Sequence, residues 1–179
     1  MAGESKDALA LPKFDEPVKV LIAVAPYYRA IADELLAGTR AVLEAAGATH
    51  DTVEVPGALE VPMAIRIAHR QSNFDGFVAL GCVVRGETTH YETVCSEANR
   101  GLTLLGLEGA AIGNAILTVE TMDQAVARAA AKGQNKGGDA AAAALHLIAL
   151  TRKWGRDKKG IGFLPESYRL AGNPGTSTA

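Results

Sequence analysis

Residues 77–94 read Phe-Val-Ala-Leu-Gly-Cys-Val-Val-Arg-Gly-Glu-Thr-Thr-His-Tyr-Glu-Thr-Val, and this stretch decides the fold class. It opens with a run of apolar residues and glycine, which is typical of a strand buried on both faces of a parallel sheet. A short polar segment follows, and from His90 onward apolar residues recur with helical spacing. The stretch therefore predicts a strand, a loop and a helix in direct succession.

The same alternation extends along the chain in both directions. Apolar runs predict strands at 18–25, 77–84 and 110–117, and an alternating pattern predicts another at 49–55. Helical periodicity follows each of the first three strands, and further helices are predicted at 121–131 and 139–154. Because parallel strands joined by helices need right-handed crossovers, we expect an α/β fold, a flavodoxin-like three-layer α/β/α sandwich with a four-stranded parallel sheet.

The length of the chain and the composition of its two ends indicate the domain organisation. A chain of 179 residues is long enough for one domain with a full core. The ends are polar and contain Gly, Pro, Ser and Thr, so they can contribute little to that core. We therefore expect an N-terminal arm at 1–15, one domain at 16–154 and a flexible C-terminal tail at 155–179.

Charge and hydropathy disfavour several classes of partner. The formal net charge is −2, and Lys and Arg are scattered apart from a short run near 152–159, which disfavours nucleic acid. The longest apolar run, 140–150, is too short to cross a bilayer. Cys82 and Cys95 have neither metal nor disulfide spacing and are predicted to be small buried side chains. We expect a cytoplasmic protein with no membrane and no nucleic-acid partner.

The residues that follow the strands predict a binding site. Carboxyl ends of parallel strands meet at one edge of the sheet, and ligands bind there. The residues that follow the four predicted strands are, in order, Tyr27 and Tyr28, Pro56 to Glu60, Arg85 to His90, and Thr118 and Glu120. Aromatic rings, glycine backbone, a carboxylate and a histidine suit a flat polar heterocycle with a hydroxylated arm beside an anion. Taken singly, each residue is also explained by packing, a turn or a helix start.

Four segments together resemble the family of 6,7-dimethyl-8-ribityllumazine synthases. They are Pro-Gly-Ala-Leu-Glu-Val-Pro at 56–62, the stretch 81–95, Ile-Leu-Thr-Val-Glu-Thr at 116–121 and Asn-Lys-Gly at 135–137. The resemblance implies condensation of 5-amino-6-ribitylaminouracil with 3,4-dihydroxy-2-butanone 4-phosphate to 6,7-dimethyl-8-ribityllumazine. Phosphate and water would be released, in the penultimate step of riboflavin biosynthesis, with no metal and no organic cofactor.

The resemblance also implies roles for single residues. His90 would be the catalytic proton carrier, because imidazole exchanges protons near neutral pH. The residues that would bind the uracil ring and the ribityl chain are Tyr27, Gly57, Ala58, Glu60, Val83, Val84 and Asn114. Those that would bind phosphate are Glu87, Thr88, Arg128 and Lys136.

An assembly is part of the same resemblance. In this family the residues that match Asn114, Arg128 and Lys136 reach the site from a neighbouring subunit, so the pocket is made by two chains. We expect a homo-oligomer, a pentamer with shared active sites, and as an extension an icosahedral shell on the order of 60 chains. Riboflavin synthase is a further expected partner.

Three other functions remain open on the sequence. The same fold and pocket could bind riboflavin or a lumazine without turnover, although a binder needs neither a proton carrier nor phosphate ligands. The chain could serve mainly as a structural shell. It could also be an archaeal-type riboflavin synthase, which shares the fold but uses a different substrate pair.

Overall fold

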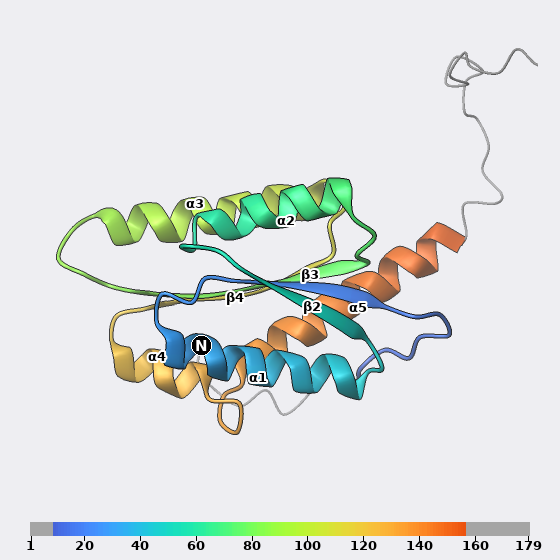
Figure 1. The fold of residues 1–179 in the computed structure, drawn as a ribbon, viewed down its shortest axis with the longest axis horizontal. Helices are drawn as coiled ribbons and strands as arrows, with labels where there is room; N and C mark the ends of the chain where they lie inside the picture. Colours follow the sequence, from blue (N-terminus) through green and yellow to red (C-terminus); the bar gives the residue numbers. More distant parts are fainter. Residues whose placement is uncertain (1–8, 157–179) are drawn as a thin grey trace, which may run out of the picture.

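The computed structural model describes residues 9–156 as one layered α/β domain (Figure 1). The strands are β1 (Lys19–Val24), β2 (Thr49–Glu54), β3 (Gly76–Val84) and β4 (Ile112–Val119). The helices are α1 (Arg29–Ala45), α2 (Glu60–Gln71), α3 (His90–Leu107), α4 (Met122–Ala129) and α5 (Lys136–Arg156). All strand pairs are parallel, and the order across the sheet is β2-β1-β3-β4.

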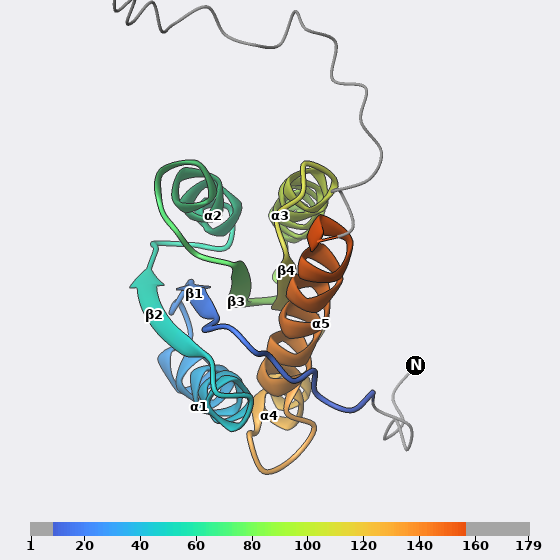
Figure 2. The same cartoon turned by 90° about the vertical axis from the view of Figure 1, so that its right-hand side faces the viewer.

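Helices cover both faces of this sheet, with α2 and α3 on one face and α1, α4 and α5 on the other (Figures 1 and 2). Alternate residues of β1 enter opposite cores: Val20 and Ile22 pack with α1 and α5, whereas Leu21 and Ala23 pack with α2 and α3. Burial on both faces explains the apolar strands. The predicted flavodoxin-like three-layer fold with four parallel strands is confirmed.

The last strand and the last helix differ from their predicted bounds. The fourth strand lies two residues later than predicted, so Thr118 is inside β4 and not after it. Helix α5 begins at Lys136, three residues before its predicted start, and so includes Gly137. A Cβ at Gly137 would lie 2.2 Å from the Leu35 carbonyl oxygen. This glycine therefore allows α5 to pack closely on α1, and the helix starts upstream of the Gly pair because that packing compensates for poor helix propensity.

The two cysteines behave differently. Cys82 is buried in β3, as predicted, whereas Cys95 is only partly buried. The buried face of α3 runs through Val94, Ala98 and Leu102, and Cys95 lies one position away from that line. The predicted burial of Cys95 is therefore wrong, because its side chain lies about a third of a helical turn away from the buried face.

The predicted arm and tail fall mainly outside the described residues. Residues 1–8 of the arm and 157–179 of the tail are not described, and α5 continues through Gly155 and Arg156. The domain boundaries at 16 and 154 stay predictions. Within residues 9–156, no helix combines the length and the apolar character that crossing a membrane requires.

Arg152 ties the end of α5 to the chain that enters the sheet. Its guanidinium donates to the carbonyl oxygens of Glu16 at 2.9 Å and Pro17 at 2.6 Å, and to a carboxylate oxygen of Asp75 at 2.9 Å. The other carboxylate oxygen of Asp75 accepts the backbone N–H of Lys19 at 2.8 Å. One side chain therefore links α5 to the starts of β1 and β3.

We expect Arg152→Ala to lower the free energy of unfolding by about 1–2 kcal/mol, because two carbonyls and a partly buried carboxylate lose a charged donor. Urea denaturation at a fixed protein concentration measures this loss. Arg100→Ala is the control, since within the described residues Arg100 pairs only with Glu97, three residues away, and both side chains are exposed. A loss no larger than that of the control would contradict this structural role.

Candidate active site

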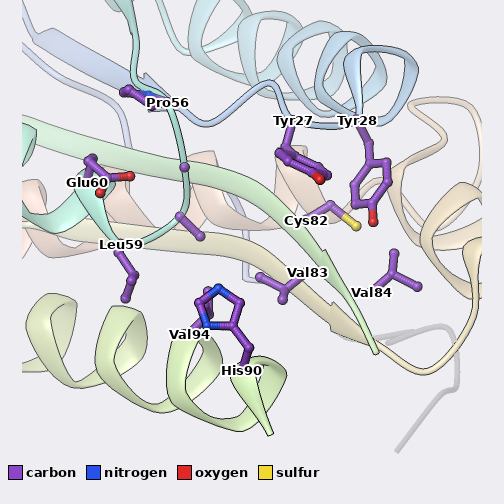
Figure 3. Close-up of a pocket in the computed structure, with 12 residues that line it drawn as sticks. Tyr27, Tyr28, Pro56, Leu59, Glu60, Cys82, Val83, Val84, His90 and Val94 are labelled. Atoms are coloured by element: carbon purple, nitrogen blue, oxygen red, sulfur yellow. The ribbon is translucent and has the colours of Figure 1, made fainter. Parts of the chain in front are cut away.

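A cavity of about 450 Å³ lies at the carboxyl ends of β1, β2 and β3 (Figure 3). The chain leaves β1 toward one edge of the sheet to form β2, and then crosses back to β3 on the other side of β1. Parallel sheets bind ligands at such a reversal of strand order. The cavity is lined by Tyr27, Tyr28, Pro56, Gly57, Ala58, Leu59, Glu60, Cys82, Val83, Val84, His90 and Val94.

Two tyrosines from the loop after β1 form one side of the cavity (Figure 3). The rings of Tyr27 and Tyr28 meet edge to face, with centroids 5.0 Å apart and planes at 79°. Tyr27 is 76% exposed, so a face of its ring is open to a ligand. Tyr28 packs against the core and holds Tyr27 by the edge contact. Partial burial raises the pKa of Tyr28, which stays a neutral hydroxyl at pH 7.

The loop after β2 carries a carboxylate to the cavity. Glu60 is the first residue of α2, and its N–H donates to the Gly57 carbonyl at 3.1 Å. A Cβ at Gly57 would lie 2.9 Å from Glu60 Oε2, so a side chain at position 57 would crowd the carboxylate. Glycine at position 57 therefore lets the backbone approach a ligand beside an acceptor that suits hydroxyl groups.

The end of β3 supplies the wall between these groups. Val83 and Val84 close the strand and are half-buried, and the buried Cys82 directly precedes them. Burial raises the pKa of the Cys82 thiol to about 11, so it is a neutral thiol at physiological pH. The side chains of this wall are apolar, and its polar groups are the backbone N–H and C=O groups at the end of β3.

His90 faces the tyrosines from the far side of the β3 end (Figure 3). It is the first residue of α3, and its side chain is exposed. The helix start follows β3 after a five-residue loop, Arg85 to Thr89. An exposed imidazole that lines the same cavity as an aromatic ring and a carboxylate can exchange protons with a bound ligand.

A second cavity, of about 320 Å³, contains the other predicted cationic residues. Arg128 of α4 and Lys136 of α5 line it together with Asn114 and Thr118 of β4. The Lys136 ammonium donates to Asp139 at 2.7 Å, and an Arg128 N–H reaches the Gln124 carbonyl at 3.4 Å. The set suits an anion that replaces the Asp139 carboxylate on Lys136, because a guanidinium and an ammonium group line the same cavity.

One chain therefore does not assemble all the predicted site residues. Tyr27, Glu60 and His90 line the first cavity, and Arg128 and Lys136 line the second. The first cavity also contains Gly57, Ala58, Val83 and Val84, and the second contains Asn114. Glu87 and Thr88 line neither cavity and are exposed in the loop before α3.

Asn114 is held firmly where it stands. Its amide N–H donates to the Asn99 side-chain oxygen at 2.7 Å, and its own side-chain oxygen accepts the Ile116 N–H at 2.8 Å. These bonds occupy both ends of the amide. They fix its orientation on the exposed surface of β4.

Two residues of these cavities were not assigned to a site by the sequence. Cys82 directly precedes Val83 in β3 and lines the first cavity, and Asp139 pairs with Lys136. A Lys-x-x-Asp spacing at a helix start is a signal that could have predicted the last contact. Within residues 9–156, no cluster of three His, Cys, Asp or Glu side chains has the arrangement of a metal site.

Comparisons with known proteins agree on one family. Residues 17–152 match the family model of 6,7-dimethyl-8-ribityllumazine synthase. The chain is similar to the protein of that name from Jannaschia sp., with 61% identity over 165 residues, which are 92% of this chain and 93% of the relative. It is also similar to those of Sphingopyxis alaskensis, at 53% identity over 76% of this chain and 96% of the relative, and of Azorhizobium caulinodans, at 54% over 77% and 91%.

Proposed function

The chain belongs to the 6,7-dimethyl-8-ribityllumazine synthase family, and on that premise we propose which of its residues carry the reaction and how chains share them. The enzyme condenses 5-amino-6-ribitylaminouracil with 3,4-dihydroxy-2-butanone 4-phosphate to 6,7-dimethyl-8-ribityllumazine, releasing phosphate and water. This is the penultimate step of riboflavin biosynthesis. The single observation that carries the proposal is the cavity that joins Tyr27, Glu60 and His90 at the reversal of strand order.

The first cavity is proposed to hold the uracil substrate. The exposed face of Tyr27 stacks on the pyrimidine ring, an arrangement that contributes about 0.5–1.5 kcal/mol beyond burial. Glu60 accepts hydrogen bonds from ribityl hydroxyls, and the backbone at Gly57 and Ala58 approaches the same chain. The strand end at Val83 and Val84 offers backbone groups to the edge of the uracil.

His90 is proposed as the proton carrier. Imine formation between the amine and the ketone, loss of phosphate and closure of the second ring each move a proton. An imidazole can accept and return protons at neutral pH in successive steps. Because His90 lies opposite Tyr27, it would face a substrate ring stacked on Tyr27 from the other side (Figure 3).

Phosphate is proposed to bind between two chains. Arg128, Lys136 and Asn114 of one chain would complete the first cavity of its neighbour. Glu87 and Thr88 would add donors from the loop before α3, since backbone N–H groups at a helix start favour anions. The observation in support is that a single chain keeps the cationic residues in a separate cavity.

This shared site makes an oligomer necessary for activity. We propose a pentamer, in which each adjacent pair of chains forms one site, with an icosahedral shell and an association with riboflavin synthase as extensions. A cytoplasmic location is part of the proposal. Its support is that Cys82 and Cys95 are both free thiols, as is usual in a reducing compartment.

An assay with both substrates tests the function directly. Incubation should produce lumazine fluorescence above the uncatalysed background, together with one phosphate per lumazine. Tight flavin binding without turnover would favour a binding protein and contradict the proposal.

We expect Tyr27→Ala and Arg128→Ala to affect different ligands, because the two residues are assigned to opposite ends of the pocket. Tyr27→Ala should raise the Kd of 6,7-dimethyl-8-ribityllumazine about tenfold, and Arg128→Ala should raise the Kd of inorganic phosphate to a similar extent. Isothermal titration of each variant with each ligand measures both effects. Equal losses for both ligands in both variants would refute the assignment.

A further inference from the structure

Arg85 connects the ends of two strands to the start of the helix that carries His90. It directly follows β3, and its Nε donates to Glu120, just after β4, at 2.5 Å. Its Nη1 donates to Glu92 in the first turn of α3. Among the ion pairs of residues 9–156, only those of Arg85 join these two carboxylates.

The same guanidinium also contacts the residue next to His90. Its central carbon lies 4.1 Å from the centroid of the Tyr91 ring, within the range of a cation–π interaction. Arg85 therefore holds two consecutive residues, Tyr91 and Glu92, that immediately follow His90. Fixing these two residues fixes the backbone from which the imidazole projects.

Within residues 9–156, α3 begins without a side-chain cap. Thr89 is the N-cap residue, but its side chain makes no capping hydrogen bond. A Cβ built at Gly86 would meet nothing within 4 Å, so the loop before the helix is open to solvent. Farther along, the Thr89 carbonyl accepts the Thr93 N–H at 3.3 Å and the Thr93 hydroxyl at 3.4 Å, and Val94 is buried.

Arg85 is not available as an anion ligand. Glu92 and Glu120 already bind it, and these two ion pairs raise the pKa of Arg85. The bond to Arg85 also lowers the pKa of Glu92, so this pair is ionised at neutral pH. A phosphate would have to displace a carboxylate, whereas Arg128 has no carboxylate partner among the described ion pairs.

We propose that Arg85 is a positioning residue for the condensation, one that sets the place of the His90 imidazole over the cavity through Glu92 and Tyr91. This inference rests on the proposed role of His90. Arg85 itself does not line the cavity, so it acts without touching the substrate.

Arg85→Met removes the charge and keeps an unbranched side chain over Tyr91. We expect kcat to fall about tenfold or more, since small displacements of a reacting group are costly, while KM for the uracil substrate changes less than about twofold. Arg85→Lys, which can retain one ion pair, should give an intermediate kcat. In a His90→Ala background, Arg85→Met should cause no further loss, because no imidazole remains to be displaced.

Arg66→Met is the matched control. Arg66 pairs with Glu108 between α2 and α3, and the side-chain exposures of 39% and 52% nearly equal the 39% and 54% of Arg85 and Glu92. Its kcat should equal that of the parent enzyme. Should Arg85→Met not fold, Glu92→Gln serves instead, because it removes the charge of one ion pair of Arg85 and leaves Glu120 in place.

The outcomes separate the two proposals. If His90→Ala lowers kcat but neither Arg85→Met nor Glu92→Gln does, the positioning role is overturned and the role of His90 stands. If the losses of Arg85→Met and His90→Ala multiply, Arg85 acts by another route and the inference is again wrong. If His90→Ala leaves kcat unchanged, the proposed role of His90 fails, and a loss in Arg85→Met then contradicts the inference as well.

Discussion

His90→Ala should lower kcat by about 10²-fold or more, the low end of what general acid–base catalysis contributes, with the affinity for the uracil substrate nearly unchanged. His90 lines the cavity opposite Tyr27 and supplies none of the surfaces assigned to ring stacking. Its removal should therefore affect proton transfer and spare ground-state binding. Steady-state kinetics with both substrates, corrected for the uncatalysed condensation, measure the loss.

His50→Ala controls for the loss of a histidine as such. His50 lies on β2, away from the cavity, with its Nε2 3.3 Å from a carboxylate oxygen of Glu44. This variant should keep the parent kcat. If His90→Ala retains the parent kcat as well, His90 has no part in the mechanism.

Mixed oligomers should regain activity that neither parent variant has. In His90→Ala chains the second cavity is intact, and in Arg128→Ala chains the first cavity is intact. Where the cavity of an Arg128→Ala chain faces a His90→Ala neighbour, both halves of the site are complete. Random assembly of equal amounts should give about one complete interface in four. Co-expression followed by a lumazine formation assay should then show activity well above that of either variant alone.

A second mixture shows whether the recovery has this cause. Tyr27 and His90 line the same cavity of one chain, so Tyr27→Ala and His90→Ala damage the same half of the site. Mixing these two variants should restore nothing beyond their average. Recovery in this control, or none in the first mixture, would contradict a site shared between chains.

The fold could be predicted from the sequence because local patterns of apolar residues determine it. The continuous apolar run of β3 requires burial on both faces, and the helical period that starts at His90 requires a crossover, which leaves few arrangements of four strands. The lining of the first cavity was also predictable. Residues that follow parallel strands must meet at one edge, and Tyr27, Glu60 and His90 do so.

Other features depend on contacts between distant residues and have no local signal. The Gly-rich sequence at 132–138 is typical of a break between helices, but Gly137 lies inside α5, where a Cβ would strike the Leu35 carbonyl oxygen, so this glycine serves helix packing. The contacts of Arg85 with Glu92 and Glu120 likewise need the geometry of two strand ends. Sequence spacing alone could not separate Arg85 from Arg128 as the available phosphate ligand.

A crystal structure of the enzyme with 6,7-dimethyl-8-ribityllumazine and inorganic phosphate tests the shared site most directly. We expect the lumazine ring to lie against Tyr27 and to face His90 of one chain, with phosphate bound by Arg128 and Lys136 of the adjacent chain. A ring bound outside this cavity would contradict the shared site. So would a phosphate that lies beside the ring and is bound by Arg128 of the same chain as Tyr27.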